Sequence, residues 1–156
     1  MADFQPAPGC NGTTWKTITP GSGGKAVTKG CTATVHAKGV VREARPSWRS
    51  VWWPHIQFAV VLLIVSRVNL SSCYYMRQTG KKFWSTKDPG QNPFTYQAGV
   101  GKVIKGWDQG CLGMQVGEVR ELIIPAHEGY GANGFPAWGI PPGGTLNFTL
   151  ECLSIQ

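Results

Sequence analysis

The chain has 156 residues, 42% of them hydrophobic, and a formal net charge of +7 at pH 7. This length fits one domain with a substantial core, and the glycine and proline content stays below that of low-complexity sequence. Residues 44–78 contain four arginines and no acid, so the rest of the chain carries +3. Because the basic residues are scattered rather than clustered, we expect no nucleic-acid partner.

The N-terminal residues 1–14 are polar and rich in proline and glycine, which predicts a flexible arm. Residues 1–8 have neither the basic start nor the apolar core of a secretory signal. The cysteines are odd in number and widely spaced, which is typical of reduced thiols. We therefore expect a cytoplasmic location, with the nucleus as the other compartment open to it. The cysteines are Cys10, Cys31, Cys73, Cys111 and Cys152.

Five segments carry the β-branched and apolar residues that are typical of strands. The first strand ends at a turn cluster of proline and glycine, residues 20–24. The last strand alternates apolar with polar residues, which predicts one buried face. The predicted strands are residues 15–19, 32–37 continuing into Val40 and Val41, 94–96, 119–124 and 146–152.

Between the predicted strands at residues 94–96 and 119–124, apolar residues recur at steps of three and four, as on one face of a helix. Glycines in the same stretch keep this predicted helix short. Several strands with one short helix predict an α+β half-barrel. The apolar face consists of Ile104, Trp107, Cys111 and Met114, and the glycines are Gly106, Gly110 and Gly113.

The last third of the chain places this helix among strands and aromatic loops, in residues 101–114, 119–125, 129–132 and 140–148. In their residues and in their order along the chain, these stretches resemble the FKBP-type peptidyl-prolyl cis-trans isomerases, the immunophilins. The resemblance implies an antiparallel β-sheet half-barrel wrapped around one short α-helix. It also implies an enzyme, an isomerase or rotamase that assists protein folding and uses no cofactor and no metal.

Rotation about an X-Pro peptide bond must overcome a barrier of about 18–20 kcal/mol, and it requires no nucleophile. A site can lower this barrier by removing water, by holding the proline ring and by favouring the twisted form. Apolar aromatic walls with a few hydrogen-bond donors suit this chemistry.

The resemblance assigns Trp107 to the floor of such a pocket. It gives the Ile104 N–H and the Tyr130 hydroxyl as donors to substrate carbonyls, and it places Phe135 in a loop that reaches over the pocket. For any single aromatic residue, simple core packing is the alternative. The implied catalytic residues are Phe83, Trp107, Tyr130 and Phe148, and the implied substrate-binding residues are Phe94, Tyr96, Val103, Ile104, Phe135 and Ile140.

The chain departs from the family pattern at three places. Ala37 replaces a tyrosine, Trp84 replaces an acidic residue, and the loop at residues 135–139 is one residue longer than usual. Losing both polar groups leaves no unpaired partner, so the pocket becomes more apolar at that wall. We expect a monomer that acts on X-Pro-containing polypeptides and binds macrolide ligands with weakened affinity.

Residues 44–78 form an insertion between Glu43 and Thr79 that interrupts the single domain expected over residues 15–156. A membrane-spanning helix needs about twenty apolar residues, and the apolar run at residues 58–65 is far shorter, so we expect no membrane association. A strand or helix packed on the domain is one alternative. We favour a non-native insertion, a retained intron translated in frame, at a hairpin tip where insertions are tolerated.

Two other functions remain open on the sequence alone. The same pocket suits a non-enzymatic proline-peptide-binding or chaperone-like module. A poorly folded isoform is the other alternative, because Trp52, Trp53 and the run at 58–65 would form an apolar patch liable to associate. None of the histidines, His36, His55 and His127, has a catalytic partner nearby in the sequence.

Overall fold

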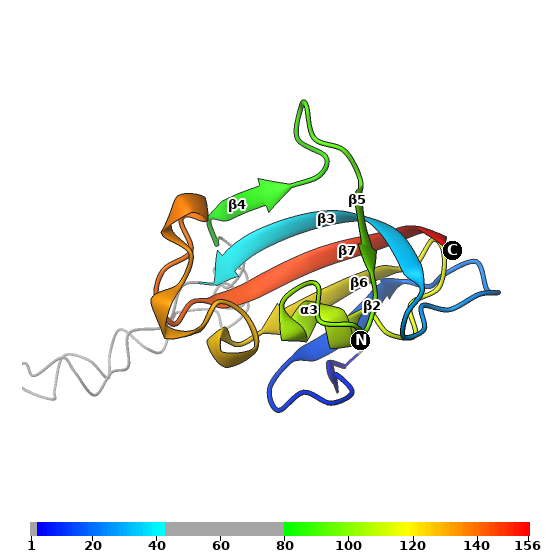
Figure 1. Cartoon of the computed structure of the whole chain (residues 1–156), viewed down its shortest axis with the longest axis horizontal. Helices are drawn as coiled ribbons and strands as arrows, with labels where there is room; N and C mark the ends of the chain where they lie inside the picture. The colour runs from blue at the N-terminus through cyan, green and yellow to red at the C-terminus, as the bar shows by residue number, and fades with distance from the viewer. Residues whose placement is uncertain (1–2, 43–79) are drawn as a thin grey trace, which may run out of the picture.

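The computed structural model describes residues 3–42 and 80–156, and the predictions made for the insertion at 44–78 lie outside this range. Within the described ranges, one antiparallel sheet curves across a single short α-helix (Figure 1). This arrangement confirms the predicted fold class. No helix in the described part of the chain has the length and apolar character needed to cross a membrane.

The strands follow the spatial order β1-β2-β6-β7-β3-β4, and β5 pairs with β3 beside this path. All five predicted strands are present, and β1 and β4 are additional. The strands are β1 Gln5–Pro6, β2 Thr14–Thr19, β3 Thr32–Arg42, β4 Lys82–Ser85, β5 Phe94–Gln97, β6 Val119–Ile124 and β7 Thr145–Ile155. The helix is α3 Lys105–Gly110, and three 3₁₀ turns follow β6 at Ala126–Glu128, Gly131–Asn133 and Pro136–Trp138.

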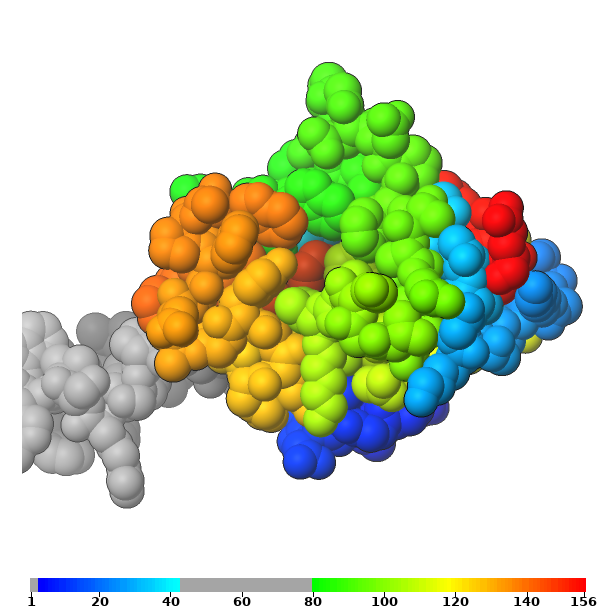
Figure 2. Space-filling view, in the orientation of Figure 1, coloured from blue at the N-terminus to red at the C-terminus, as the bar shows by residue number. Residues whose placement is uncertain are grey.

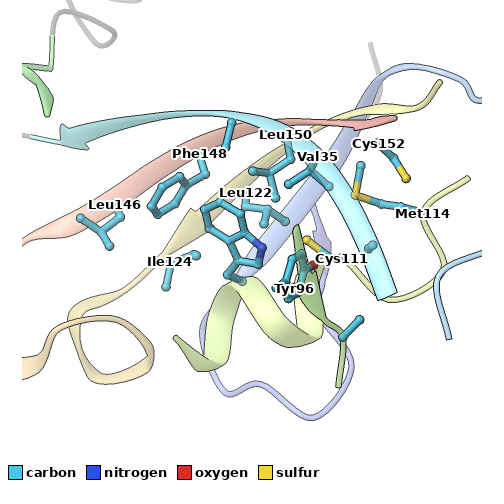
Figure 3. Close-up of a cluster of buried hydrophobic side chains, with 14 of the residues drawn as sticks. Val35, Tyr96, Cys111, Met114, Leu122, Ile124, Leu146, Phe148, Leu150 and Cys152 are labelled. Atoms are coloured by element: carbon cyan, nitrogen blue, oxygen red, sulfur yellow. The ribbon is translucent and has the colours of Figure 1, made fainter. Parts of the chain in front are cut away.

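The buried face of β7 is the one that the sequence predicts. Leu146, Phe148, Leu150 and Cys152 are each no more than 2% exposed. Leu122 and Ile124 of β6 are the register partners of Phe148 and Leu146. Figure 3 shows these apolar side chains gathered on one side of the sheet, over α3. The alternation of the last strand therefore locates the core.

The helix is shorter than the apolar face predicted from residues 104 to 114. Ile104 is its N-cap, and Met114 lies beyond its end. Tight turns nevertheless carry the face onward, because the Cys111 N–H donates to Trp107 O at 3.0 Å and the Met114 N–H donates to Cys111 O at 3.1 Å. Trp107, Cys111 and Met114 are all buried as predicted.

Two glycines let α3 approach β6 more closely than other residues would allow. A Cβ at Gly110 would lie 2.6 Å from the Cδ2 atom of Leu122, and one at Gly106 would collide with Ile124. In the sequence, these glycines predict only that the helix is short. The structure adds a packing reason, because their missing side chains make room for β6.

Arg120 of β6 ties the end of α3 to the sheet. Its guanidinium donates to Gly110 O at 2.8 Å and to Leu112 O at 3.1 Å, and it pairs with Glu118 at 2.8 Å. The same group lies 3.8 Å from the ring centroid of Trp15. Carbonyl oxygens at a helix end lack partners within the helix, so Arg120 satisfies groups that burial would otherwise leave unpaired.

The N-terminal segment differs from the predicted flexible arm over most of its described length. Gln5 pairs with Trp15 of β2, and Ala7 is buried. The Asn11 N–H donates to the Glu128 carboxylate at 2.6 Å, and the Thr13 N–H and hydroxyl donate to it at 2.8 and 2.6 Å. A buried carboxylate requires such donors, which is why this segment packs on the domain.

Glu128 generates a prediction for stability against pH. Burial opposes its ionisation, but the hydrogen bonds from Thr13 and Asn11 and the charge of Lys105 outweigh burial and lower the Glu128 pKa to about 2. An unfolded glutamate titrates at about 4.3, so between these values the unfolded chain binds more protons. The stabilisation is therefore complete above about pH 5 and is lost as the pH falls toward 2.

We expect Glu128→Gln to lower the free energy of unfolding by about 1.5–3 kcal/mol at pH 7 and to flatten the acid decline. Urea unfolding at pH 7, 4 and 3 measures both effects. Glu151→Gln is the control, since the Glu151 carboxylate is paired at the surface and contributes little. Equal acid slopes for Glu128→Gln and the unchanged protein would contradict the prediction.

The strands β3 and β4 form a hairpin whose tip contains the insertion. Lys38 pairs with Ser85 and Gly39 with Trp84, and the Val41 N–H donates to Lys81 O at 3.1 Å. The two chain segments that flank the insertion are thus already held together by the sheet.

We propose that residues 44–78 are dispensable for the fold. Deleting them leaves residues 42, 43, 79 and 80 as a connection of ordinary hairpin length. We expect an equal or higher melting temperature by calorimetry, because loop closure costs more for a longer loop. A glycine–serine linker of equal length separates the effect of length from that of sequence. A deletion variant that fails to fold would place the segment in the core.

Candidate functional site

A cavity of about 290 Å³ opens between α3, β4, β7 and the 3₁₀ turns after β6. Figure 2 shows it as a hollow bordered by the green β4–β5 region, the yellow-green region of α3 and the orange 3₁₀ turns. Apolar and aromatic side chains dominate its lining, with one cationic residue. The lining residues are Trp84, Phe94, Lys102, Val103, Ile104, Trp107, Tyr130, Trp138 and Phe148.

Trp107 lies at the centre of this arrangement and is 4% exposed. Its ring centroid lies 4.8 Å from that of Phe148, 5.9 Å from Phe94, 6.1 Å from Tyr96 and 6.3 Å from Trp84. All four separations fall within the range of favourable aromatic pairs. The indole is therefore fixed by packing from three strands and forms the floor of the cavity.

A second aromatic group closes the cavity from the side of the 3₁₀ turns. The rings of Trp84 and Trp138 are stacked at 6.1 Å with an interplanar angle of 7°. Trp138 also stacks on Phe83 at 6.3 Å and contacts Phe135 edge-on at 5.2 Å. Phe135 in turn stacks on Tyr130 at 5.4 Å. The wall formed by β4 and the 3₁₀ turns thus consists of aromatic rings in contact.

Two departures from the family pattern meet in this wall. Trp84 stands at the position expected to be acidic, and Trp138 belongs to the loop that is one residue longer than usual. Their stacking means that the longer loop supplies the ring against which the substituted indole packs. The sequence gives no direct sign of this pairing, because the residues are distant along the chain.

Of the ten residues that the resemblance assigns to the site, six line the cavity: Trp107, Tyr130, Phe148, Phe94, Val103 and Ile104. Four do not line it. Phe83 packs edge-on against Phe148 behind the wall, Tyr96 is buried beside Trp107, and Phe135 covers Tyr130. Ile140 is 1% exposed and belongs to the core. Phe83, Tyr96 and Phe135 therefore contact lining side chains without lining the cavity themselves.

Three lining residues were not among the assigned ones. They are Trp84, which departs from the family pattern, Trp138, which lies in the lengthened loop, and Lys102. Lys102 directly precedes Val103 and Ile104, so its place next to two assigned residues could have indicated it. Trp138 could have been found only as an aromatic residue in a loop of unusual length.

Among the donors of the lining, three have no hydrogen-bond partner in the described residues: the Ile104 N–H, the Tyr130 hydroxyl and the buried Trp107 Nε1–H. The Ile104 carbonyl accepts a hydrogen bond from the Asp108 N–H at 3.0 Å, and Ile104 is the N-cap of α3. Burial raises the pKa of Tyr130, so its hydroxyl keeps its proton at neutral pH and can donate.

Among the residues that the structure describes, those that line the cavity include no histidine, no cysteine and no carboxylate. His36 lies in β3, where its Nδ1 atom is 3.0 Å from the Thr86 hydroxyl, and His127 is exposed. Burial raises the pKa of the Cys111 thiol to about 12, which leaves it protonated and unreactive. The lining therefore offers shape, an apolar environment and a few donors, and it offers no nucleophile.

The comparisons with known proteins agree with this geometry. The model of the FKBP-type peptidyl-prolyl cis-trans isomerase family matches residues 67–153, and it begins inside the segment predicted as an insertion. The chain belongs to the FKBP-type peptidyl-prolyl cis-trans isomerases. The family and its named members support isomerisation of peptidyl-prolyl bonds as the class of activity of this chain.

The relatives extend this assignment to both sequence and fold. The FKBP12 isomerase of Vicia faba is 62% identical and that of Arabidopsis thaliana 59% identical over 76 residues, which are 49% of this chain and 68% of each relative. A crystal structure of the three FKBP domains of wheat FKBP73 superimposes with a TM-score of 0.69 at 20% identity. It covers 99% of this chain, and this chain spans 51% of that one, so this likeness speaks for the fold alone.

Gly39 sets the position of two rings beside the cavity of this FKBP domain. A Cβ there would lie 2.8 Å from the Phe148 Cε1 atom and would collide with the ring of Phe83. We expect Gly39→Ala to lower the free energy of unfolding by about 1–3 kcal/mol, because both rings must move. Chemical denaturation measures the loss, and Lys38→Ala, an exposed neighbour on the same strand, is the control. If the free energy of unfolding changes by less than about 0.5 kcal/mol, as in ordinary surface substitutions, the two rings can move aside at little cost.

Proposed function

We propose that this chain isomerises X-Pro bonds without covalent chemistry, inside the aromatic cavity above Trp107. The observation that carries the proposal is the buried indole enclosed by aromatic rings beside two unpaired hydrogen-bond donors. At about 290 Å³ the cavity lies at the small end of the range for ligand pockets. Such a size suits one proline ring with its flanking peptide groups.

Desolvation supplies the main part of the proposed mechanism. The planar peptide is stabilised by resonance that separates charge, whereas the twisted form is less polar at the C–N bond. A lining that excludes water therefore disfavours the planar form relative to the twisted one. Each 1.36 kcal/mol of such preference accelerates rotation about tenfold.

The proposed roles follow the position of each residue. Trp107 forms the floor beneath the prolyl ring, and Phe94 and Phe148 form its sides. The Ile104 N–H and the Tyr130 hydroxyl hold two carbonyls of the substrate, so that the bond between them can rotate against fixed ends. Phe83, Tyr96, Phe135 and Ile140 act behind these residues, as the supports of the lining.

A binding module without turnover is the rival function, because the same cavity would hold a proline-containing peptide. The two are separated by measuring isomerisation and binding together. We expect the unchanged chain to accelerate cis–trans exchange of an X-Pro peptide in an NMR exchange assay. Peptide binding without faster exchange would favour the binding module.

Trp107→Leu tests the role of the floor. We expect kcat/KM to fall by at least tenfold, because the aliphatic side chain neither fills the floor nor keeps contact with the four rings around it. Trp15→Leu is the matched control, since Trp15 lies on β2 against Arg120 and outside the lining. If Trp107→Leu folds poorly, kcat/KM of Tyr130→Phe, which removes only a hydroxyl, provides a second test. Unchanged turnover in both site variants would refute the proposed mechanism.

The apolar wall bears on macrolide binding. Two relatives are named FK506-binding proteins, and the resemblance implies that an acidic group at the Trp84 position assists such ligands. Trp84 is the register partner of Gly39, and Ala37 lies two residues away on the same buried face of β3. Diagonal neighbours of this kind lie within reach of aromatic side chains. The tyrosine and the carboxylate of the family pattern would therefore meet at this place.

We predict that Ala37→Tyr combined with Trp84→Asp strengthens FK506 binding at least tenfold while changing peptide turnover only modestly. The restored acceptor regains a hydrogen bond of about 1–3 kcal/mol, and removal of the indole leaves space for the new ring. Calorimetry measures the affinity, and Ala37→Tyr alone is the control, since it adds the ring without the space. Unchanged affinity in the double variant would show that this wall does not contact the macrolide.

We further propose that the chain assists protein folding as a monomer in the cytoplasm, with the nucleus as a second compartment. All four cysteines in the described residues are unpaired, which supports a reducing environment. The substrates of this proposal are polypeptides with X-Pro bonds.

A further inference from the structure

Among the described residues that line the cavity, Lys102 is the one with a charged side chain, and it is exposed at the mouth. Every other lining residue is apolar or aromatic. A charge at the edge of an apolar site contributes little to holding a proline ring. It can, however, distinguish between peptides by the charge of the residues beside the proline.

Most acidic residues in the described part of the chain are paired with groups other than Lys102. Five of them form ion pairs with other basic residues: Glu121 with Lys16, Asp88 with Lys82, Glu151 with Lys87, Glu128 with Lys105 and Glu118 with Arg120. None of these pairs involves Lys102. Its ammonium is therefore available to a carboxylate that a ligand brings.

Asp108 holds in place the loop that carries Lys102. Its buried carboxylate accepts hydrogen bonds from the Gly99 N–H at 2.7 Å and the Gly101 N–H at 2.9 Å. The carboxylate is thus turned toward the backbone rather than toward the lysine. Because Gly101 adjoins Lys102, these bonds fix where the lysine side chain begins.

The distance along the chain places Lys102 beside the proposed substrate contact. Only Val103 lies between Lys102 and Ile104, so their Cα atoms are at most about 7 Å apart. A substrate whose carbonyl accepts the Ile104 N–H therefore passes within reach of the long, flexible lysine side chain. An acidic residue next to the proline would meet the ammonium at the mouth of the cavity.

From this arrangement we infer that Lys102 makes the cavity prefer X-Pro peptides with a carboxylate on a residue flanking the proline. The inference rests on the proposed isomerase function and narrows its substrate class. At low ionic strength the preference in kcat/KM is about two- to fivefold, the range of an exposed ion pair. It declines as salt is added, because screening weakens attraction between exposed charges.

The experiment uses the full chain and two pairs of peptides that differ only as Glu against Gln, placed either before or after the proline. NMR exchange gives kcat/KM for each peptide at 20 mM and 500 mM NaCl, concentrations chosen so that the screening length changes by roughly fivefold. The quantity compared is the Glu-to-Gln ratio, which cancels any general loss of activity. Variants are Lys102→Gln, Lys102→Glu and, as a control with the same change in net charge, Lys25→Gln, an exposed lysine outside the lining.

We expect a ratio of about two to five at one of the two positions in the unchanged protein and in Lys25→Gln. It should fall to about one in Lys102→Gln and below one in Lys102→Glu. A ratio of one at both positions, or an equal fall in Lys25→Gln, would overturn the inference while leaving the isomerase function intact. Exchange of neither peptide of a pair would instead count against the proposed function itself.

Discussion

The close contact between α3 and β6 is the constraint on which the rest of this domain depends. A helix of six residues without a side-chain N-cap is too short to be stable by itself, so its position must come from tertiary packing. Gly106 and Gly110 allow the approach, and Arg120 completes it by binding the carbonyl oxygens at the end of the helix. Trp107, between the two glycines, is thereby directed against Phe148.

Charge and cavity are kept apart in this fold. The buried ionic groups, among them Asp108, Glu118, Arg120 and Glu128, hold loops, the helix end and the N-terminal segment. In the lining, as far as residues 3–42 and 80–156 form it, the only charge is that of Lys102 at the mouth. This separation allows the frame to be rigid and polar while the site stays apolar. A desolvation mechanism requires such an arrangement, because buried charges in the lining would retain water.

The wall formed by Trp84 and Trp138 shows how separate departures from a family pattern can be one structural feature. Taken singly, an indole in place of an acid and a lengthened loop look like unrelated changes. In the structure the two rings are stacked, and the longer loop supplies the contact that the indole requires. The consequence is a wall of aromatic rings at a place where the family pattern implies polar groups.

Sequence reasoning succeeded where the physical signal is periodic and local. The alternation in residues 146–152 and the apolar steps from Ile104 to Met114 gave the buried faces of β7 and of the helical region, because periodicity follows directly from backbone geometry. The family resemblance placed six of its ten site residues at the cavity. It could not separate lining residues from supporting ones such as Tyr96 and Phe83, because that distinction depends on which ring lies in front.

The sequence by itself therefore determined the strands, the short helix, the aromatic character of the site and the family. Only the tertiary structure decided that residues 5–13 pack on the domain, that Trp138 faces Trp84 and that Lys102 stands at the mouth of the cavity. The reason is that each of these features depends on contacts between segments far apart in the chain. Such contacts depend on the curvature of the sheet and on the position of the helix against it, and no local pattern of residues predicts them.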